Sequence, residues 1–192
     1  QILSDTSLIN TRTDRVHQGA IQRHPSYTGS GVVMGFVDTG IDFTHPDFKN
    51  KDGSTRIVKI WDQTKNADST LRPSFGCGEV YDSAMINAGN CPHIDNNGHG
   101  TQVCGMGAGN GNSVPDSIAD YTGHAPNSTI ICVNTDFNRA NWTLSIAESI
   151  EWIFSEADKL GLPCVVNLSV GTYPGSHDGK DLASNKYRFV KY

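Results

Sequence analysis

The 192-residue chain is long enough for one domain with a substantial hydrophobic core. Its formal net charge of -5 argues against a nucleic-acid-binding protein, because such proteins normally present a basic surface. No apolar run reaches the length of about 18 residues that a membrane-spanning helix needs, so we expect no membrane span. The sequence begins with Gln1, and no signal peptide is recognisable in it.

Residues 1–30 are polar and weakly periodic, and we expect them to form an N-terminal arm with one short helix over 13–22. A glycine-rich turn then precedes a continuous apolar run over 32–37. Such a run predicts a strand that is buried on both faces of a parallel sheet. This strand ends at Asp38, and a second strand is predicted over 56–61.

Residues 63–97 form an insertion that contains Pro, Gly and Asn, for which we expect loops and one short helix over 83–88. Cys77 and Cys91 bracket part of this insertion, and the spacing is consistent either with a disulfide or with two free thiols. The remaining cysteines lie inside apolar runs and predict small buried side chains; they are Cys104, Cys132 and Cys164.

The second half of the chain alternates between helices and strands. We expect a helix over 98–109, a strand over 129–133, a helix over 142–160 and a strand over 164–170. The apolar residues of the longest helix recur at helical spacing, and a glycine and a proline follow its end. This alternation predicts an α/β fold with a parallel sheet, in which active sites lie at the carboxyl ends of the strands.

Asp38 and His99 are candidate catalytic residues. A carboxylate at the end of a buried strand needs hydrogen bonds, which the backbone after Asp38 can donate. Such a carboxylate can accept the Nδ1 proton of an imidazole and leave Nε2 free to take a proton from a hydroxyl group. Each residue alone has a plainer explanation, a turn or cap for Asp38 and a packed histidine for His99. The hypothesis therefore depends on the pair.

Four segments resemble motifs of the subtilisin-like serine proteases (subtilases, peptidase family S8), and they occur in the order of that family. They are residues 33–48 for the aspartate motif, 95–105 for the histidine motif, 123–127 for a Gly-Val-Ala-Pro turn and 165–171 for the strand along the substrate cleft. His124 departs from the usual Val. The resemblance implies a three-layer subtilisin-like fold with a parallel central sheet. Residues 1–192 would form a partial peptidase domain whose C-terminal portion is missing.

The resemblance also implies roles for individual residues. Asp38 would orient His99, and His99 would act as the general base. The backbone of Ser169, Val170 and Gly171 would bind an extended peptide substrate as an added strand. Asp47 falls where the family often has a calcium ligand, although a capping carboxylate explains it as well; no cofactor would be required for the chemistry. Secretion or a place in the cell envelope would follow from the same resemblance.

The sequence departs from the family at the nucleophile. No Gly-Thr-Ser segment and no asparagine in the position of the family's oxyanion hole occur, and residues 180–192 diverge from the family pattern. We therefore expect a serine endopeptidase domain that carries Asp38 and His99 but is inactive as an isolated chain. The alternative is a non-catalytic relative that binds peptides or acts as a scaffold. An incomplete sheet would expose an edge, so we also expect self-association.

A metal site is a weaker alternative. His93, Asp95 and His99 are close in sequence, but their spacing does not place two ligands on one helical face. The sequence contains no phosphate-binding Gly-x4-Gly-Lys-Ser/Thr run either.

Overall fold

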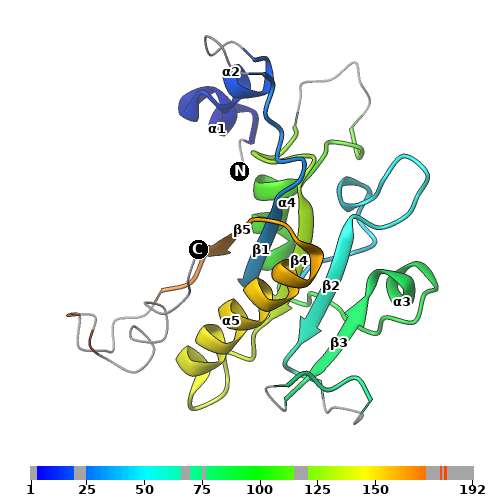
Figure 1. Ribbon diagram of the computed structural model, residues 1–192, viewed down its shortest axis with the longest axis vertical. Coiled ribbons are helices and arrows are strands. Elements are labelled where there is room, and N and C mark those ends of the chain that lie inside the picture. Colours follow the sequence, from blue (N-terminus) through cyan, green and yellow to red (C-terminus); the bar gives the residue numbers. More distant parts are fainter. Residues whose placement is uncertain are drawn as a thin grey trace.

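The computed structural model describes residues 4–19, 25–65, 70–74, 77–114, 121–171, 178 and 180. Five strands form one sheet in the order β3-β2-β4-β1-β5, with helices on both of its faces (Figure 1). The strands are β1 (Val33–Asp38), β2 (Ile57–Asp62), β3 (Glu79–Asp82), β4 (Thr129–Asn134) and β5 (Cys164–Leu168). The helices are α1 (Ser4–Thr11), α2 (Thr13–His17), η1 (Pro46–Phe48), α3 (Ser83–Asn87), α4 (His99–Ala108) and α5 (Trp142–Leu160).

Four of the strands run parallel, as predicted. β1 pairs with β4 and β5, and β2 pairs with β4. The predicted α/β fold with a parallel central sheet is therefore confirmed. The fifth strand, β3, was not predicted; it pairs antiparallel with β2 at the edge of the sheet, inside the segment for which loops were expected.

The two faces of the sheet contribute to two separate hydrophobic clusters. On one face, Phe36 of β1 packs in a cluster with Cys104 and Ala108 of α4. On the other face, Val33 and Val37 of β1 pack in a cluster with residues of α5, which crosses in front of the strands in Figure 1. Alternate residues of β1 thus serve opposite clusters, which explains why its sequence is apolar throughout. The result is the predicted three-layer arrangement.

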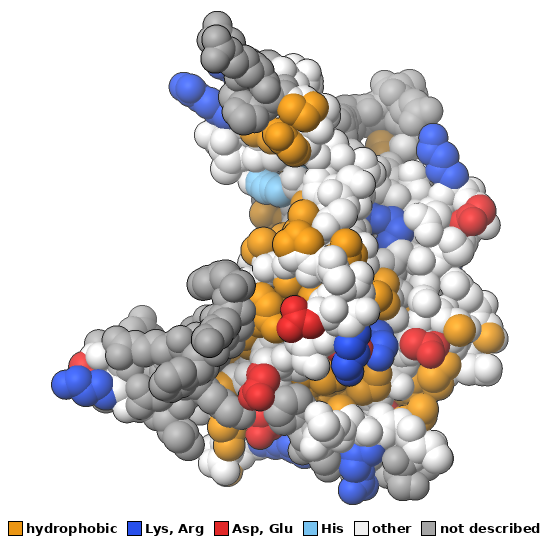
Figure 2. All heavy atoms as spheres, viewed as in Figure 1, with side chains coloured by type: hydrophobic (Ala, Val, Ile, Leu, Met, Phe, Trp, Pro, Cys, Tyr) orange, Lys and Arg blue, Asp and Glu red, His pale blue; other side chains and the backbone are white. Residues whose placement is uncertain are grey.

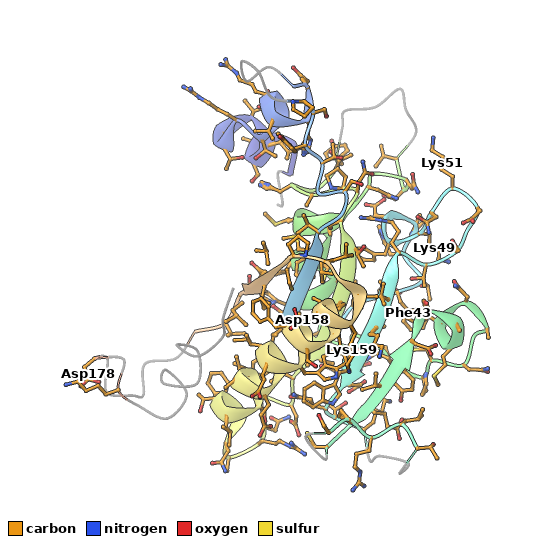
Figure 3. The ribbon with its side chains drawn as sticks, in the orientation of Figure 1. Phe43, Lys49, Lys51, Asp158, Lys159 and Asp178 are labelled. Carbon is orange, nitrogen blue, oxygen red and sulfur yellow. The ribbon has the colours of Figure 1, made fainter. Side chains whose placement is uncertain are left out.

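Helix α5 lies close to the sheet because β1 has a glycine beneath it. A Cβ atom on Gly35 would lie 2.5 Å from Cγ2 of Ile153, so no larger residue fits there without a shift. Glu156 of α5 is buried and bonds through one carboxylate oxygen to Lys59 of β2 and through the other to Lys159, at 2.6 Å each. Figure 3 labels Lys159. The ion pair between Glu156 and Lys59 thus connects α5 to β2.

Several local predictions are refined. The N-terminal arm contains two helices, α1 and α2, where one was expected, and residues 20–24 lie outside the described residues. Cys77 and Cys91 are free thiols, as are the other three cysteines, so the disulfide alternative is wrong for this structure. Of the divergent tail, only Lys180 lies within the described residues. None of the helices described here is long and apolar enough to cross a membrane.

Candidate active site

The fold brings Asp38 and His99 together from segments far apart in the sequence. Asp38 is the last residue of β1, and His99 is the first residue of α4. Nδ1 of His99 lies 2.7 Å from Oδ1 of Asp38. The Asp38 side chain is 1% exposed, whereas the His99 side chain is 48% exposed. The carboxylate is thus enclosed in the fold, while about half of the imidazole remains exposed.

The Asp38 carboxylate is oriented by the backbone that follows it. The N–H of Thr39 donates to Oδ1 of Asp38 at 2.7 Å, as the sequence suggested, and the main-chain oxygen of Asp38 accepts the N–H of Thr135 at 2.8 Å. With Oδ1 as its acceptor, His99 carries its proton on Nδ1 and presents the lone pair of Nε2. That tautomer is the one a general base requires.

A second carboxylate, Asp95, joins the turn after β1 to the start of α4. Its Oδ1 accepts the hydroxyl of Thr39 at 2.9 Å and the N–H of Gly98 at 2.9 Å. Its Oδ2 accepts both the N–H and the hydroxyl of Thr101, at 2.9 and 2.6 Å. Partial burial alone would raise the pKa of Asp95, but the hydrogen bonds from Thr101, Gly98 and Thr39 outweigh it and hold the pKa below its ordinary value.

The two segments approach each other closely because both carry glycine. A Cβ atom on Gly100 would lie 2.1 Å from the main-chain oxygen of Gly40. Gly40 itself has a φ of +108°, and Gly98 has a φ of +81°. Residues other than glycine rarely adopt such positive φ values. The glycines around His99 therefore set the distance between the helix and the Asp38 turn.

The residues predicted to bind substrate lie at the same end of the sheet. Leu168 of β5 pairs with Val37 of β1, so Ser169 follows beside the end of β1 that carries Asp38. Ser169 and Gly171 are exposed, and Val170 is partly exposed. Nearby, a cavity of about 330 Å³ is lined by residues that include Thr39, Asn97 and Asn134. Residues 169–171 and this cavity thus both lie near the end of β1 that carries Asp38.

Asp47 lies apart from this pair, in η1. Its Oδ1 accepts the N–H of Ser113 at 2.7 Å, and its main-chain oxygen accepts a hydrogen bond from Arg56 at 2.9 Å. The same guanidinium also donates to the carbonyls of Ala108 and Ser128. Asn110 and Asn112, which follow α4, donate their side-chain amides to the carbonyl of Lys49. Figure 3 labels Lys49. Of the loop 110–116, residues 115 and 116 lie outside the described residues.

The metal-site alternative does not fit the geometry. Nδ1 of His93 lies 2.6 Å from Oδ2 of Asp62, and Nε2 accepts the N–H of Ile41, so both ring nitrogens have partners. Asp95 accepts its hydrogen bonds as described above. Within the part of the chain that the structure describes, no three His, Cys, Asp or Glu side chains are grouped as metal ligands would be.

Asp62 and Asn134 also lie near the site, although neither was predicted there. In the register of the sheet, Asn134 lies between Asp38 and Asp62, so three polar residues end three neighbouring strands. A signal for Asp62 was present, because it follows the apolar strand 57–61 just as Asp38 follows its own strand.

Comparison with known proteins identifies relatives of this chain. The Subtilase family matches residues 29–190 of the chain. The serine protease AprX of Bacillus subtilis is 31% identical over 148 residues, which cover 76% of this chain and 26% of that protein. Subtilisin DY of Bacillus licheniformis is 30% identical over 162 residues, which cover 84% of this chain and 44% of that protein.

Among solved structures, that of the Clostridium perfringens CspB protease matches with a TM-score of 0.74 and 30% sequence identity. The match covers 92% of this chain and 37% of the CspB chain. The chain thus spans less than half the length of each of these three proteins.

Proposed function

Because this chain belongs to the subtilase family, we propose that it supplies the general base and the orienting carboxylate of a serine endopeptidase site. The observation that carries the proposal is the 2.7 Å contact between Nδ1 of His99 and Oδ1 of Asp38, with the imidazole half exposed. The family alone would not show that this particular pair is assembled for base catalysis.

The proposed chemistry follows from this geometry. Nε2 of His99 takes the proton of a serine hydroxyl as that oxygen attacks the carbonyl carbon of a peptide bond. The imidazolium that forms is stabilised by the buried Asp38 carboxylate, and it then returns the proton to the leaving amine. A substrate in extended conformation would hydrogen-bond to the backbone of 169–171, beside the pair.

The 192 residues contain no Gly-Thr-Ser segment, so we propose that hydrolysis requires a nucleophile from outside them. Loss of the nucleophile in such a site lowers the rate by a factor of about 10⁶. The pure 192-residue chain is therefore expected to leave peptides intact and to remain unlabelled by a fluorophosphonate probe, which reacts with activated serines. Stoichiometric labelling of this chain would overturn that part of the proposal.

A reading of the gene decides between a protease and a non-catalytic relative. An in-frame continuation into a Gly-Thr-Ser segment supports the protease, and in that longer protein His99→Ala should abolish peptide hydrolysis while the protein remains folded. A gene without such a segment supports the alternative, a peptide-binding or scaffold protein. The exposed side chains of Val165 and Leu168 on the edge strand β5 favour binding of some kind in either case.

The same edge supports a proposal of self-association. In the part of the chain described here, β5 pairs on one side only, with β1. Val165 is 60% exposed and Leu168 is 39% exposed. Apolar side chains are also exposed in the middle of the face shown in Figure 2. Light scattering coupled to size-exclusion chromatography should therefore detect species larger than the monomer; a monomer at high concentration would contradict this.

Two secondary proposals come from the family resemblance. Secretion or a place in the cell envelope is tested by fractionating the native host.

A structural calcium ion at Asp47 would use its carboxylate and oxygens of the 110–116 loop as ligands. Thermal unfolding in calcium and in a chelator tests it, because a bound ion raises Tm and its removal lowers it. The Arg56 guanidinium donates to the main-chain oxygen of Asp47 and leaves the carboxylate available to an ion, so an unchanged Tm would overturn the calcium proposal.

A further inference from the structure

A second, fully buried Asp–His pair lies behind the candidate active site, and we propose that its histidine, His93, is a positioning residue for the Asp38 carboxylate. It would act as a neutral imidazole that holds the turn 38–41 in place. The inference rests on the proposed function, because it concerns the alignment of the same site. The chemistry proposed above makes no use of His93.

The hydrogen bonds of His93 fix both its tautomer and its charge. Its side chain is 0% exposed, and that of its partner Asp62 is 1% exposed. Nε2 of His93 lies 3.2 Å from the N–H of Ile41, and because a backbone N–H can only donate, Nε2 must carry a lone pair. The ring proton therefore resides on Nδ1, 2.6 Å from Oδ2 of Asp62, and the imidazole is neutral.

Asp62 is held as an anion that orients this ring. Its Oδ1 accepts the N–H and the hydroxyl of Thr64 at 3.0 and 2.6 Å, and also the side-chain amide of Asn134 at 3.0 Å. Burial alone would raise the pKa of Asp62, but the hydrogen bonds from His93 and Thr64 outweigh it and lower the pKa. The carboxylate thus stays an acceptor for the Nδ1 proton of His93.

The imidazole contacts the catalytic turn by packing as well as by its hydrogen bond. A Cβ atom on Gly40 would lie 2.5 Å from both Cε1 and Nε2 of His93, so the backbone of the turn rests directly on the ring. Ile41, whose N–H the ring accepts, is fully buried. The turn therefore cannot move toward His93, and the hydrogen bond opposes its movement away.

The same network reaches Asp38 through the sheet. Asn134, which donates to Asp62, is paired in register with Asp38 on the neighbouring strand. The next residue, Thr135, donates its N–H to the carbonyl of Asp38 at 2.8 Å. One set of contacts thus begins at Asp62 and reaches Asp38 along two routes, through His93 and Ile41 and through Asn134. If His93 only filled space, it would not need a hydrogen bond at either ring nitrogen.

The first test needs no substitution. Nitrogen-15 NMR of the histidine rings in the 192-residue chain should show His93 as a neutral imidazole protonated on Nδ1. A protonated imidazolium, or a proton on Nε2, at neutral pH would overturn the inference, because Nε2 could then not accept the N–H of Ile41.

The second test follows the proton shared by His99 and Asp38, which should give a low-field proton resonance. His93→Phe fills the space but makes neither hydrogen bond, and His93→Asn keeps a donor toward Asp62. We expect the resonance to shift or disappear in His93→Phe and to be partly retained in His93→Asn. His124→Phe is the matched control, a half-buried histidine in the loop before β4, and should leave the resonance unchanged.

The outcomes separate this inference from the proposed function. Absence of the low-field resonance from the wild-type chain would count against the Asp38–His99 pair itself. Its presence in the wild type and its unchanged position in folded His93→Phe or His93→Asn would overturn only the positioning role. If His93→Phe does not fold, His93→Asn and the wild-type tautomer decide the question.

Discussion

The hydroxyl group of Thr39 donates to Oδ1 of Asp95 at 2.9 Å and accepts the N–H of Gly100 at the same distance. Thr39 directly follows Asp38, and Gly100 directly follows His99. One hydroxyl group therefore couples the strand that carries Asp38 to the helix that carries His99. The alignment of Asp38 and His99 depends on this link as well as on the direct contact between their side chains.

Replacement of Thr39 by Val keeps the shape of the side chain and removes the hydroxyl. Gly100 and Asp95 each lose a partner, so we expect the free energy of unfolding to fall by about 1–3 kcal/mol. Urea unfolding measures this loss. Thr39→Ser is the control, because it keeps the hydroxyl; equal losses in the two variants would assign the effect to packing of the methyl group instead.

Gly100 and Gly105 lie on the same helix but should respond in opposite ways to Ala. In Gly100→Ala the new Cβ meets the carbonyl of Gly40 at 2.1 Å, and backbone cannot rotate away as a side chain would. We expect overpacking to lower the free energy of unfolding by about 1–3 kcal/mol and to separate His99 from Asp38.

At Gly105 nothing lies within 4 Å of a new Cβ, so Gly105→Ala should stabilise the helix by roughly 0.5–1 kcal/mol. Thermal unfolding of both variants measures the difference. A loss of stability in Gly105→Ala would contradict the open space around Gly105, and no loss in Gly100→Ala would contradict the close approach of α4 to the turn.

Acid should weaken the fold through Asp95. Its folded pKa is lowered from the ordinary value of 3.8, so the unfolded chain binds the proton first as the pH falls. The stabilisation is fully present above pH 3.8 and is lost as the pH falls through the lower folded pKa. In Asp95→Asn we expect lower stability at neutral pH and a flatter acid profile.

Urea unfolding across this acid range compares the two proteins. Asp158→Asn, which removes an exposed carboxylate from α5 (Figure 3), controls for the change in net charge. A parallel shift of the whole profile in Asp95→Asn, without flattening, would show that the carboxylate does not titrate differently in the folded and unfolded states.

His124 should make the free energy of unfolding depend on pH in a range above that of Asp95. Burial and the neighbouring His17 lower the pKa of His124 from 6.5, so the folded protein favours the neutral ring. The unfolded chain is protonated first as the pH falls below 6.5, and stability decreases until the folded pKa is passed. His124→Val removes this contribution, and urea unfolding between about pH 7 and pH 5 should then show a smaller decrease. An identical slope in both proteins would contradict it.

The sequence predicted those parts of the fold whose apolar pattern is long and continuous. Strands β1, β2, β4 and β5 and helix α5 were located to within about two residues, as expected for strongly periodic segments. Strand β3 was missed because it has only 4 residues, begins with Glu79 and ends with Asp82, and acquires its conformation by pairing with β2. Helix α1 was missed because Leu8 is its single buried apolar residue.

The proximity of Asp38 and His99 was predictable because each residue sits in a distinctive local motif. The contacts that align these two residues were not predictable, because they join the pair to residues elsewhere in the chain. The burial of His93 depends on how the insertion 63–97 returns to the sheet, and no local pattern specifies that return. The calcium proposal at Asp47 and the divergent tail stay predictions.

The strand order has a consequence for the kinetics of folding. β1 is made first among the strands, yet Val33 finds its partners only at Thr129 and Cys164. Pairings over such separations close large loops before they gain contacts, which slows folding. During synthesis on the ribosome, the segment that ends in Asp38 therefore stays unpaired and prone to aggregation until most of these residues have emerged.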